Sequence, residues 1–241
     1  MEGTAMSDAS ACAAALTSAK GRTHASRPAG QVIISCDAFD GLKQYLIDSG
    51  REVVEFGPID NVAGPVRKHP DLVFCKLGPG KVFEGDPGKL SPKYPGDVIY
   101  NGCSTGKYFI HNLKYTDPGL LSIAREAGLE LINVRQGYGR CSILPIDEDS
   151  IITYDKGIAI VCEDAGLNVL RVVPGLVALP GYDEGFIGGT AGRVGDEILF
   201  NGDLSAHPDF GAIRDFIRER GLRVRYFEGW PLTDIGSVIE V

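Results

Sequence analysis

The sequence predicts an α/β fold in which units of strand, strand, helix and strand repeat and close into a ring. Three observations predict it: a glycine recurs at the ends of predicted helices, pairs of short strands precede helices, and the C-terminal strand has no helix of its own. A chain of 241 residues is within the size range of one large domain. We therefore expect one domain over residues 31–241, preceded by a disordered or loosely ordered tail at residues 1–30.

The predicted helices share one kind of ending. Four amphipathic stretches are each followed by a glycine and then by an alternating apolar run, as expected where a left-handed C-cap leads into a strand. These glycines are Gly50, Gly128, Gly166 and Gly221. Three helices also begin alike, because each has an N-cap side chain or an early proline, at Asp117-Pro118, Asp155 and His207-Pro208-Asp209. The sequence thus predicts four helix-to-strand junctions of one design.

The last two predicted helices are each preceded by a pair of strands. The pairs are residues 141–146 with 150–154, and residues 185–194 with 197–202. The long interval from Phe56 to Tyr100 leaves room for a further, degenerate unit with strands near 72–77 and 81–85. We therefore expect four or five units.

Closure of the ring depends on the two ends of the domain. Residues 236–241 predict a short strand that completes the unit begun by residues 31–36. A ring of this kind leaves no sheet edge exposed. A doubly wound parallel sheet is the competing architecture, but it has one strand for each helix. The strand pairs ahead of the helices favour the ring.

Charge and hydropathy exclude several classes of partner. The chain has 24 basic and 32 acidic residues, for a net charge of −8, so nucleic acid is not an expected ligand. Its apolar runs stop far short of the ~20 residues of a membrane-spanning helix. Residues 1–30 lack the continuous apolar segment of a signal peptide. We expect a soluble, cytoplasmic protein that starts at Met1 or Met6.

The cysteine and glycine patterns predict neither a metal nor a cofactor. Six cysteines are spread along the chain with no C-x-x-C pair, which disfavours a disulfide scaffold and a structural zinc site. The glycine-rich segments 102–107 and 185–192 depart from the phosphate-binding and dinucleotide-binding patterns. We interpret their glycines as points where neighbouring units approach closely.

The layout of these units resembles the pentein, or α/β-propeller, superfamily. Its members include dimethylargininase, arginine deiminase, the amidinotransferases and the non-enzymatic translation initiation factor six. The segments NLKYTDP, QGYGRCS, SIITYDKGIA, LPGYDEGFIGG and DIGSVI also resemble an uncharacterised family of bacterial proteins of similar length, which brings no assigned activity.

The pentein resemblance implies a reaction at a guanidine carbon. In the catalytic members a cysteine thiolate attacks that carbon, a histidine protonates the leaving nitrogen, and carboxylates hold the guanidinium. His69-Pro70-Asp71 is similar to their His-x-Asp/Glu element, and Cys141 follows a glycine-rich segment as their nucleophile does. Their cysteine lies near the C-terminus, whereas this chain has none after Cys162.

The resemblance therefore gives a first hypothesis for a small-molecule site. Cys141 is the nucleophile, His69 the general acid and base, and Asp71 and Asp183 orient a guanidino or amino-acid-like substrate. The alternative for Cys141 is a packed core thiol, and the alternative for His69 is the start of a strand.

Other charged residues extend this hypothesis. Acidic residues at unit ends share one mouth if the ring closes, and they are Asp71, Asp155, Asp183, Glu184 and Asp234. Arg140 suits the carboxylate of an amino-acid-like ligand. His111, between a predicted strand and a helix, is either a cleft residue or a loop histidine with its hydrogen bonds satisfied.

A second hypothesis is a non-catalytic pentein that binds a partner through one end of the ring, as the initiation factor does. Its expected sign is a broad apolar patch that includes Tyr226, Phe227 and Trp230.

Overall fold

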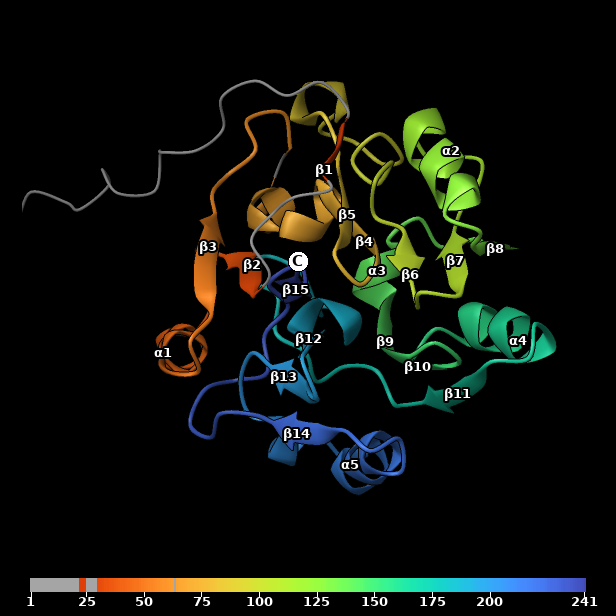
Figure 1. The fold of residues 1–241 in the computed structure, drawn as a ribbon. Helices are drawn as coiled ribbons and strands as arrows, with labels where there is room; N and C mark the ends of the chain where they lie inside the picture. The colour runs from red at the N-terminus through yellow and green to blue at the C-terminus, as the bar shows by residue number, and fades with distance from the viewer. Residues whose placement is uncertain (1–21, 25–29, 63) are drawn as a thin grey trace, which may run out of the picture.

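The computed structural model describes residues 22–24, 30–62 and 64–241, which form a mixed α/β fold (Figure 1). Within these residues the strands form five three-stranded sheets. The first two sheets are β15 (Ile239–Glu240), β2 (Gln31–Ser35) and β3 (Glu52–Phe56), and β1 (Arg22–His24), β5 (Lys81–Glu84) and β4 (Phe74–Gly78). The other three are β6 (Cys103–Ser104), β7 (Tyr108–His111) and β8 (Glu130–Asn133); β9 (Ile143–Asp147), β10 (Ser150–Thr153) and β11 (Asn168–Arg171); and β12 (Ala191–Val194), β13 (Glu197–Phe200) and β14 (Arg223–Arg225).

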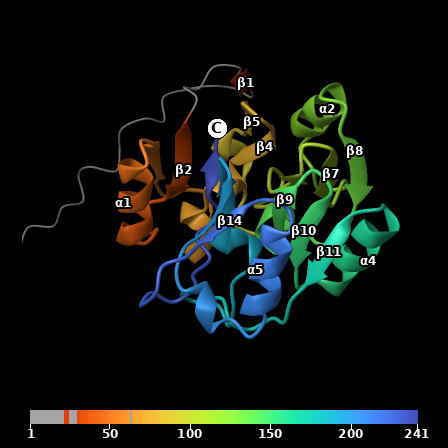
Figure 2. The ribbon, with the colours of Figure 1, turned by 60° about the horizontal axis from the view of Figure 1, so that its bottom comes forward.

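Four of the sheets have one common plan. The first strand pairs antiparallel with the middle strand, and the middle strand pairs parallel with the third. A helix links the middle strand to the third, and these helices are α1 (Asp40–Asp48), α2 (Pro118–Glu126), α4 (Lys156–Asp164) and α5 (Phe210–Arg218). The helices lie at the outside of the molecule in Figure 1, and Figure 2 shows α1, α2 and α4 at the rim from a second direction. The predicted strand, strand, helix and strand unit is therefore confirmed in these four sheets.

The fifth sheet departs from this plan. Its strands β4 and β5 lie where the sequence predicts a degenerate unit, but both β4 and β1 pair antiparallel with β5, and no helix lies between β4 and β5. Most of the predicted tail, residues 1–21 and 25–29, lies outside the described residues.

The helix ends follow the sequence prediction. Gly50, Gly128, Gly166 and Gly221 all have φ between 71° and 91°, the left-handed C-cap conformation. The Asp117 carboxylate accepts hydrogen bonds from two backbone amides at the start of α2, and the Asp155 carboxylate accepts one at the start of α4. Asp209 precedes α5 but forms no side-chain cap.

One strand from each of the five sheets packs in the interior: β4 of the fifth sheet, and β6, β9, β12 and β15 of the four regular sheets. β4 contacts β6, β6 contacts β9, β9 contacts β12, β12 contacts β15, and β15 contacts β4. β15 pairs antiparallel with β2, so the prediction that the C-terminal strand completes the N-terminal unit is confirmed. We call these five strands the inner strands.

Glycine permits the close packing of the inner strands. A Cβ on Gly192 of β12 would meet the carbonyl of Val238, just before β15, and a Cβ on Gly188 would meet the carbonyl of Ile143 in β9. The interpretation of this glycine segment as a close approach between units is confirmed.

Two predicted strands begin later than expected. Residues 139–142 form a short helix, α3 (Gly139–Ser142), before β9, because the amides of Arg140 and Cys141 donate to the side chain of Asn101. Residues 188–190 form a 3-10 turn, η4 (Gly188–Thr190), before β12. Both turns lie at the N-terminal ends of inner strands, where the candidate site is found.

The core fills the space between sheets and helices. One buried cluster contains Leu120 of α2, Phe109 of β7 and Phe83 of β5. It therefore joins a helix to strands of two different sheets. Among the described residues, no helix has the length and apolar character needed to cross a lipid bilayer.

Candidate functional site

Three side chains named by the sequence analysis meet at the N-terminal ends of β4 and β9. His69 and Asp71 flank the start of the 3-10 helix η2 (Pro70–Leu72), ahead of β4, and Cys141 lies in α3, ahead of β9. A ligand atom from each of the three lies within 4.8 Å of the others. The Cys141 Sγ donates a hydrogen bond of 3.1 Å to Asp71 Oδ2. All three residues are 3% exposed or less.

Proline sets the backbone at His69. The His69 backbone is extended, with φ −83° and ψ 114°, and Pro70 begins η2 directly after it. Extended backbone is what a following proline imposes. The Asp71 amide then donates to the carbonyl of Gly236, which ties this turn to the segment before β15.

Asn101 and Ser237 complete the hydrogen bonding of these groups. The Asn101 amide nitrogen donates to Cys141 Sγ at 3.4 Å and to the Asp71 carbonyl at 3.1 Å. The Ser237 hydroxyl donates to Asp71 Oδ2 at 2.7 Å. The sequence analysis missed both residues. The signal that could have found them is position, because Asn101 lies two residues before β6 and Ser237 lies two residues before β15, as Cys141 lies two residues before β9.

Asp234 brings a second buried carboxylate. Its Oδ1 lies 3.7 Å from His69 Nδ1. The backbone amides of Phe186 and Gly236 donate to its two oxygens at 2.9 and 3.0 Å. Burial outweighs these hydrogen bonds and raises the pKa of Asp234 to about 6. We call His69, Asp71, Asn101, Cys141, Asp234 and Ser237 the thiol cluster.

The burial of the thiol cluster shifts the pKa values of its sulfur, carboxyl and imidazole groups. Burial, followed by the charges of Asp71 and Asp234, raises the pKa of the Cys141 thiol well above its ordinary value. Burial raises the pKa of Asp71 and lowers the pKa of His69. Near pH 7 the thiol is therefore protonated and the imidazole is neutral.

Two buried polar atoms of the cluster have no hydrogen-bond partner among the described residues. They are His69 Nδ1 and Asp71 Oδ1. Unpaired buried polar atoms are costly and are found where a ligand or a reacting group belongs. His69, Asp71 and Cys141 also present the nitrogen, oxygen and sulfur donors that zinc prefers. The cluster therefore has both nucleophile and ligand capacity.

An aromatic row adjoins the thiol cluster. The rings of Tyr138, Phe186 and Tyr154 stack with centroid separations of 5.9 and 5.8 Å. Tyr138 directly precedes α3, and the Phe186 amide donates to Asp234, so the row is attached to the cluster through the backbone. The Tyr138 hydroxyl donates to Asp97 Oδ2 at 2.5 Å. Sequence reasoning did not identify this row.

The side chains of two other residues named from the sequence form no hydrogen bond with the thiol cluster among the described residues. Asp183 is exposed in the segment that follows β11. No contact between Asp183 and Cys141 among the described residues supports its predicted role in orienting a substrate. The Arg140 guanidinium donates to the carbonyls of Ile143, Gly188 and Ala191 at 2.8 to 3.0 Å, which ties β9 to η4 and β12. Arg140 thus holds these three backbone segments together.

His111 is a structural residue. Its Nδ1 lies 2.8 Å from Thr116 Oγ1, and its Nε2 lies 2.7 Å from the Gly137 carbonyl. Both ring nitrogens have partners, as the structural alternative predicts, but His111 is the last residue of β7 and does not lie in a loop.

A comparison with curated proteins finds no match. A family model described as "Family of unknown function (DUF6873)" matches residues 81–239. The matched range contains Asn101, Cys141 and Asp234, whereas His69 and Asp71 precede it. Because this range is more than half of the 241-residue chain, the chain belongs to this family of unknown function.

Proposed function

We propose that the chain is a pentein-like α/β propeller whose thiol cluster catalyses thiol-dependent hydrolysis or group transfer on a guanidino or related cationic C–N compound. The observation that carries the proposal is the approach of Cys141, His69 and Asp71 within 4.8 Å, from segments far apart in the chain. A nucleophile, a proton carrier and a carboxylate in mutual reach are the groups that such a reaction needs.

The pairing of the strands supports the propeller arrangement. Five sheets contribute one inner strand each, and the contacts of these strands run from β4 through β6, β9, β12 and β15 back to β4. Segments that precede three of them, β4, β9 and β15, supply His69, Asp71, Cys141 and Ser237. Closure of the propeller is thus what would gather the thiol cluster at one end of an axis.

The charges of the cluster favour a cationic substrate. Asp71 and Asp234 are buried carboxylates, and Arg140 is committed to backbone carbonyls. A guanidinium beside these carboxylates gains charge-assisted hydrogen bonds and removes the repulsion that opposes a thiolate. Substrate binding would therefore lower the pKa of Cys141 in the same step that positions the carbon to be attacked.

The proposed reaction balances without any further reagent than water. The Cys141 thiol gives its proton to Asp71 as Sγ attacks the guanidinium carbon. A carbon–nitrogen bond breaks, and the leaving amine receives that proton through His69. Water then attacks the same carbon of the positively charged thiouronium, the carbon–sulfur bond breaks, one proton of the water returns to the sulfur, and the other leaves to solvent as the urea-type product forms. In a transfer reaction an acceptor amine takes the place of water.

Access to the thiol requires local movement, because Cys141 is 2% exposed. The aromatic row beside the cluster is the segment whose displacement would admit a substrate. Tyr138 directly precedes α3, which contains Cys141, and the amide of Phe186 donates to Asp234. Neither residue belongs to an inner strand, so a shift of these rings would open the cluster without breaking one.

Turnover of a panel of guanidino compounds, including arginine, agmatine and methylguanidine, tests the proposal. We expect release of amine or ammonia by the wild type, complete loss in Cys141→Ser, and no change in Cys162→Ser, which removes a buried thiol of α4. Activity that persists in EDTA identifies thiol attack, whereas activity lost in EDTA and retained in Cys141→Ser identifies a metal-bound hydroxide and contradicts the proposal.

The burial of the thiol favours a second candidate, a non-catalytic binding protein. In this case Cys141 is a packed thiol, consistent with its raised pKa. The aromatic patch expected for such a protein is in part packed: Trp230 stacks on Phe39 with a centroid separation of 5.0 Å, and Phe227 contacts the same ring. A folded protein that turns over none of the panel supports this candidate.

A further inference from the structure

A second site lies at the other ends of the inner strands. A pocket of about 430 Å³ is lined mainly by residues from the C-terminal parts of the five inner strands or from the turns after them, and Arg140 reaches it from α3. Each inner strand contributes to the lining, with Lys76 of β4, Ser104 of β6, Ile146 of β9, Arg193 of β12 and Glu240 of β15. The thiol cluster, by contrast, is built from residues that precede the inner strands, so the two sites are distinct.

Three cations and three carboxylates line this pocket. The cations are Lys76, Arg140 and Arg193, and Arg51 lies beside the pocket. One of the carboxylates, Glu240, is already engaged by Arg51 at 2.7 Å and by the Gly195 amide at 3.1 Å. We call this site, defined by Lys76, Arg140, Arg193 and Glu240, the basic pocket.

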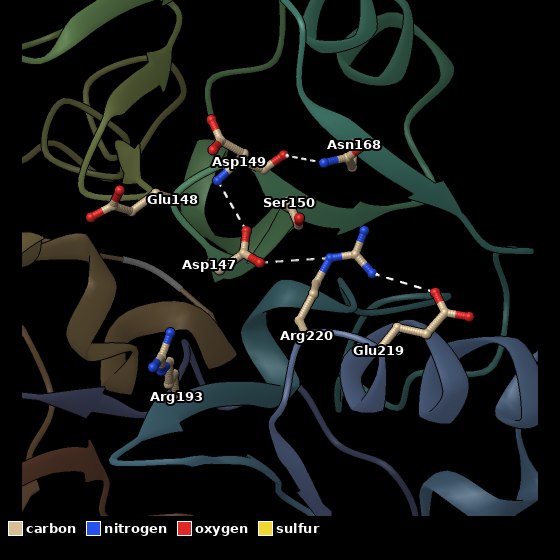
Figure 3. A pocket seen from close by; sticks show the side chains of 8 residues that line it. All are labelled: Asp147, Glu148, Asp149, Ser150, Asn168, Arg193, Glu219 and Arg220. Carbon is tan, nitrogen blue, oxygen red and sulfur yellow. Dashed lines mark hydrogen bonds and ion pairs between the residues drawn. The ribbon is translucent and has the colours of Figure 1, made fainter.

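The rim of the basic pocket carries two further carboxylates, Asp147 and Glu148. Figure 3 shows both from the neighbouring surface hollow, where the guanidinium of Arg220 faces Asp147 at 3.7 Å. Asp147 also accepts the amide of Asp149. Arg193 is drawn there without a link to any carboxylate, and its guanidinium donates to the carbonyls of Gly195 and Ile146 instead.

Lys76 is the cation of the pocket whose donors form no hydrogen bond among the described residues. Its Nζ lies 3.8 Å from Glu240 Oε2, beyond hydrogen-bond distance, and no hydrogen bond joins Nζ to another described residue. Burial lowers the pKa of Lys76, and Arg193, Arg140 and Arg51 lower it further, against the opposite effect of Glu240. An ammonium held among three guanidinium groups is stabilised by an anion.

We propose that the basic pocket binds a small oxyanion ligand, a carboxylate or phosphate compound, with Lys76 and Arg193 as its direct contacts. Lys76 has unused donors pointing into a pocket that all five sheets line. Arg193 uses one terminal nitrogen and Nε on carbonyls, which leaves its second terminal nitrogen as a donor. Arg140, held by three carbonyls, adds fixed positive charge.

Isothermal titration with inorganic phosphate and with citrate, at constant ionic strength, tests this site. We expect saturable binding of at least one probe, weakened about tenfold or more in Lys76→Gln and in Arg193→Gln, because charge-assisted hydrogen bonds are lost. Whichever probe saturates identifies the ligand class as phosphate or carboxylate. Lys93→Gln, a change at an exposed lysine away from the pocket, is expected to bind as the wild type does.

Two further variants keep the result interpretable. Lys76→Arg preserves the charge and should restore most of the affinity, which a merely misfolded Lys76→Gln would not explain. Cys141→Ser should bind the probe with the affinity of the wild type. Binding at the basic pocket is therefore tested independently of the proposed thiol reaction. Absence of saturable binding by either probe, or equal affinity in the wild type and Lys76→Gln, would overturn the proposal.

Discussion

Asp71 is the buried carboxylate that accepts the hydrogen bond of the Cys141 thiol. Its Oδ2 accepts hydrogen bonds from the Cys141 thiol and the Ser237 hydroxyl, and its Oδ1 has no hydrogen-bond partner among the described residues. The Cys141 pKa is raised by burial first and by the Asp71 charge second. A change at Asp71 therefore acts directly on the sulfur.

Replacement of Asp71 by asparagine tests that coupling. Asp71→Asn removes the negative charge that opposes the thiolate, so we expect the pKa of Cys141 to fall and its alkylation by iodoacetamide at pH 8 to accelerate several-fold. Mass spectrometry of the Cys141 peptide over a pH series measures the rate. Asp183→Asn, at the exposed aspartate, should leave the profile unchanged; an unchanged or slower rate in Asp71→Asn would contradict the coupling.

Residue types predicted part of the site. His69, Asp71, Cys141 and Asp234 combine chemistry-bearing side chains with positions at unit ends, so the sequence could nominate them. Asn101 and Ser237 carry no such mark, because their roles come from long-range packing that places them beside Cys141 and Asp71. Asp183 is also an aspartate at a unit end, but its side chain is exposed. The neighbouring sequence does not specify whether this side chain points to the interior or to solvent.

At the scale of elements, the cap of α4 gives a direct stability test. Asp155 accepts a hydrogen bond of 2.9 Å from the Ile158 amide. Asp155→Ala leaves that amide unsatisfied, and we expect a loss of about 1 kcal/mol in the free energy of unfolding. Asp155→Asn keeps an acceptor oxygen and should lose much less. Urea unfolding of the three proteins makes the comparison, and equal losses in both variants would count against the cap.

His111 links β7 to two turns and gives the fold a pH dependence. Burial lowers its pKa from 6.5 to about 4. Between these values the unfolded chain binds the proton and the folded chain does not, so stability falls as the pH falls from 6.5 to 4. We expect the wild type to lose about 3 kcal/mol through this group on going from pH 7 to pH 4.

The His111→Gln variant isolates this contribution. It should be less stable than the wild type at pH 7, because the hydrogen bonds to Thr116 and Gly137 are altered. Its additional loss between pH 7 and pH 4 should be smaller by about 3 kcal/mol. Urea unfolding at both pH values measures the difference, and an equal loss in both proteins would show that His111 does not titrate as described.

Most elements were predictable because their signals are local. The glycine C-caps, the aspartate caps of α2 and α4, and the strand pairs ahead of α4 and α5 are each contained within a few residues. The elements that were not predicted depend on distant partners. The pairing of β1 with β5 joins segments far apart in the chain, and α3 forms where Asn101 accepts the amides of Arg140 and Cys141.

At the scale of the molecule, the contact between β12 and β15 connects the last two inner strands. Gly192→Ala puts a methyl group against the Val238 carbonyl, so we expect a loss of about 2 kcal/mol or more. Gly211→Ala is the matched control, because its added methyl group meets no atom within 4 Å and improves helix propensity in α5. Thermal unfolding compares the two, and equal stability would contradict close packing of the inner strands.

The architecture separates two kinds of charge. Segments before the inner strands gather the buried carboxylates Asp71 and Asp234, and the opposite ends gather Lys76 and Arg193, where the guanidinium of Arg140 reaches the same pocket from α3. The repeat layout could be predicted from the sequence, but this separation could not, because it depends on which side chain each strand end presents. The two proposed sites follow from it, one for a cation and one for an anion.

A pair of matched alkylating probes tests most directly whether Cys141 reacts with cationic C–N compounds. Chloroacetamidine carries a positive charge, whereas chloroacetamide is its neutral counterpart. We predict that mass spectrometry finds Cys141 alkylated about tenfold or more faster by the cation, with the preference lost when Asp71 and Asp234 are both replaced by asparagine. Equal rates with the two probes, or an unmodified Cys141 in the folded protein, would contradict the account.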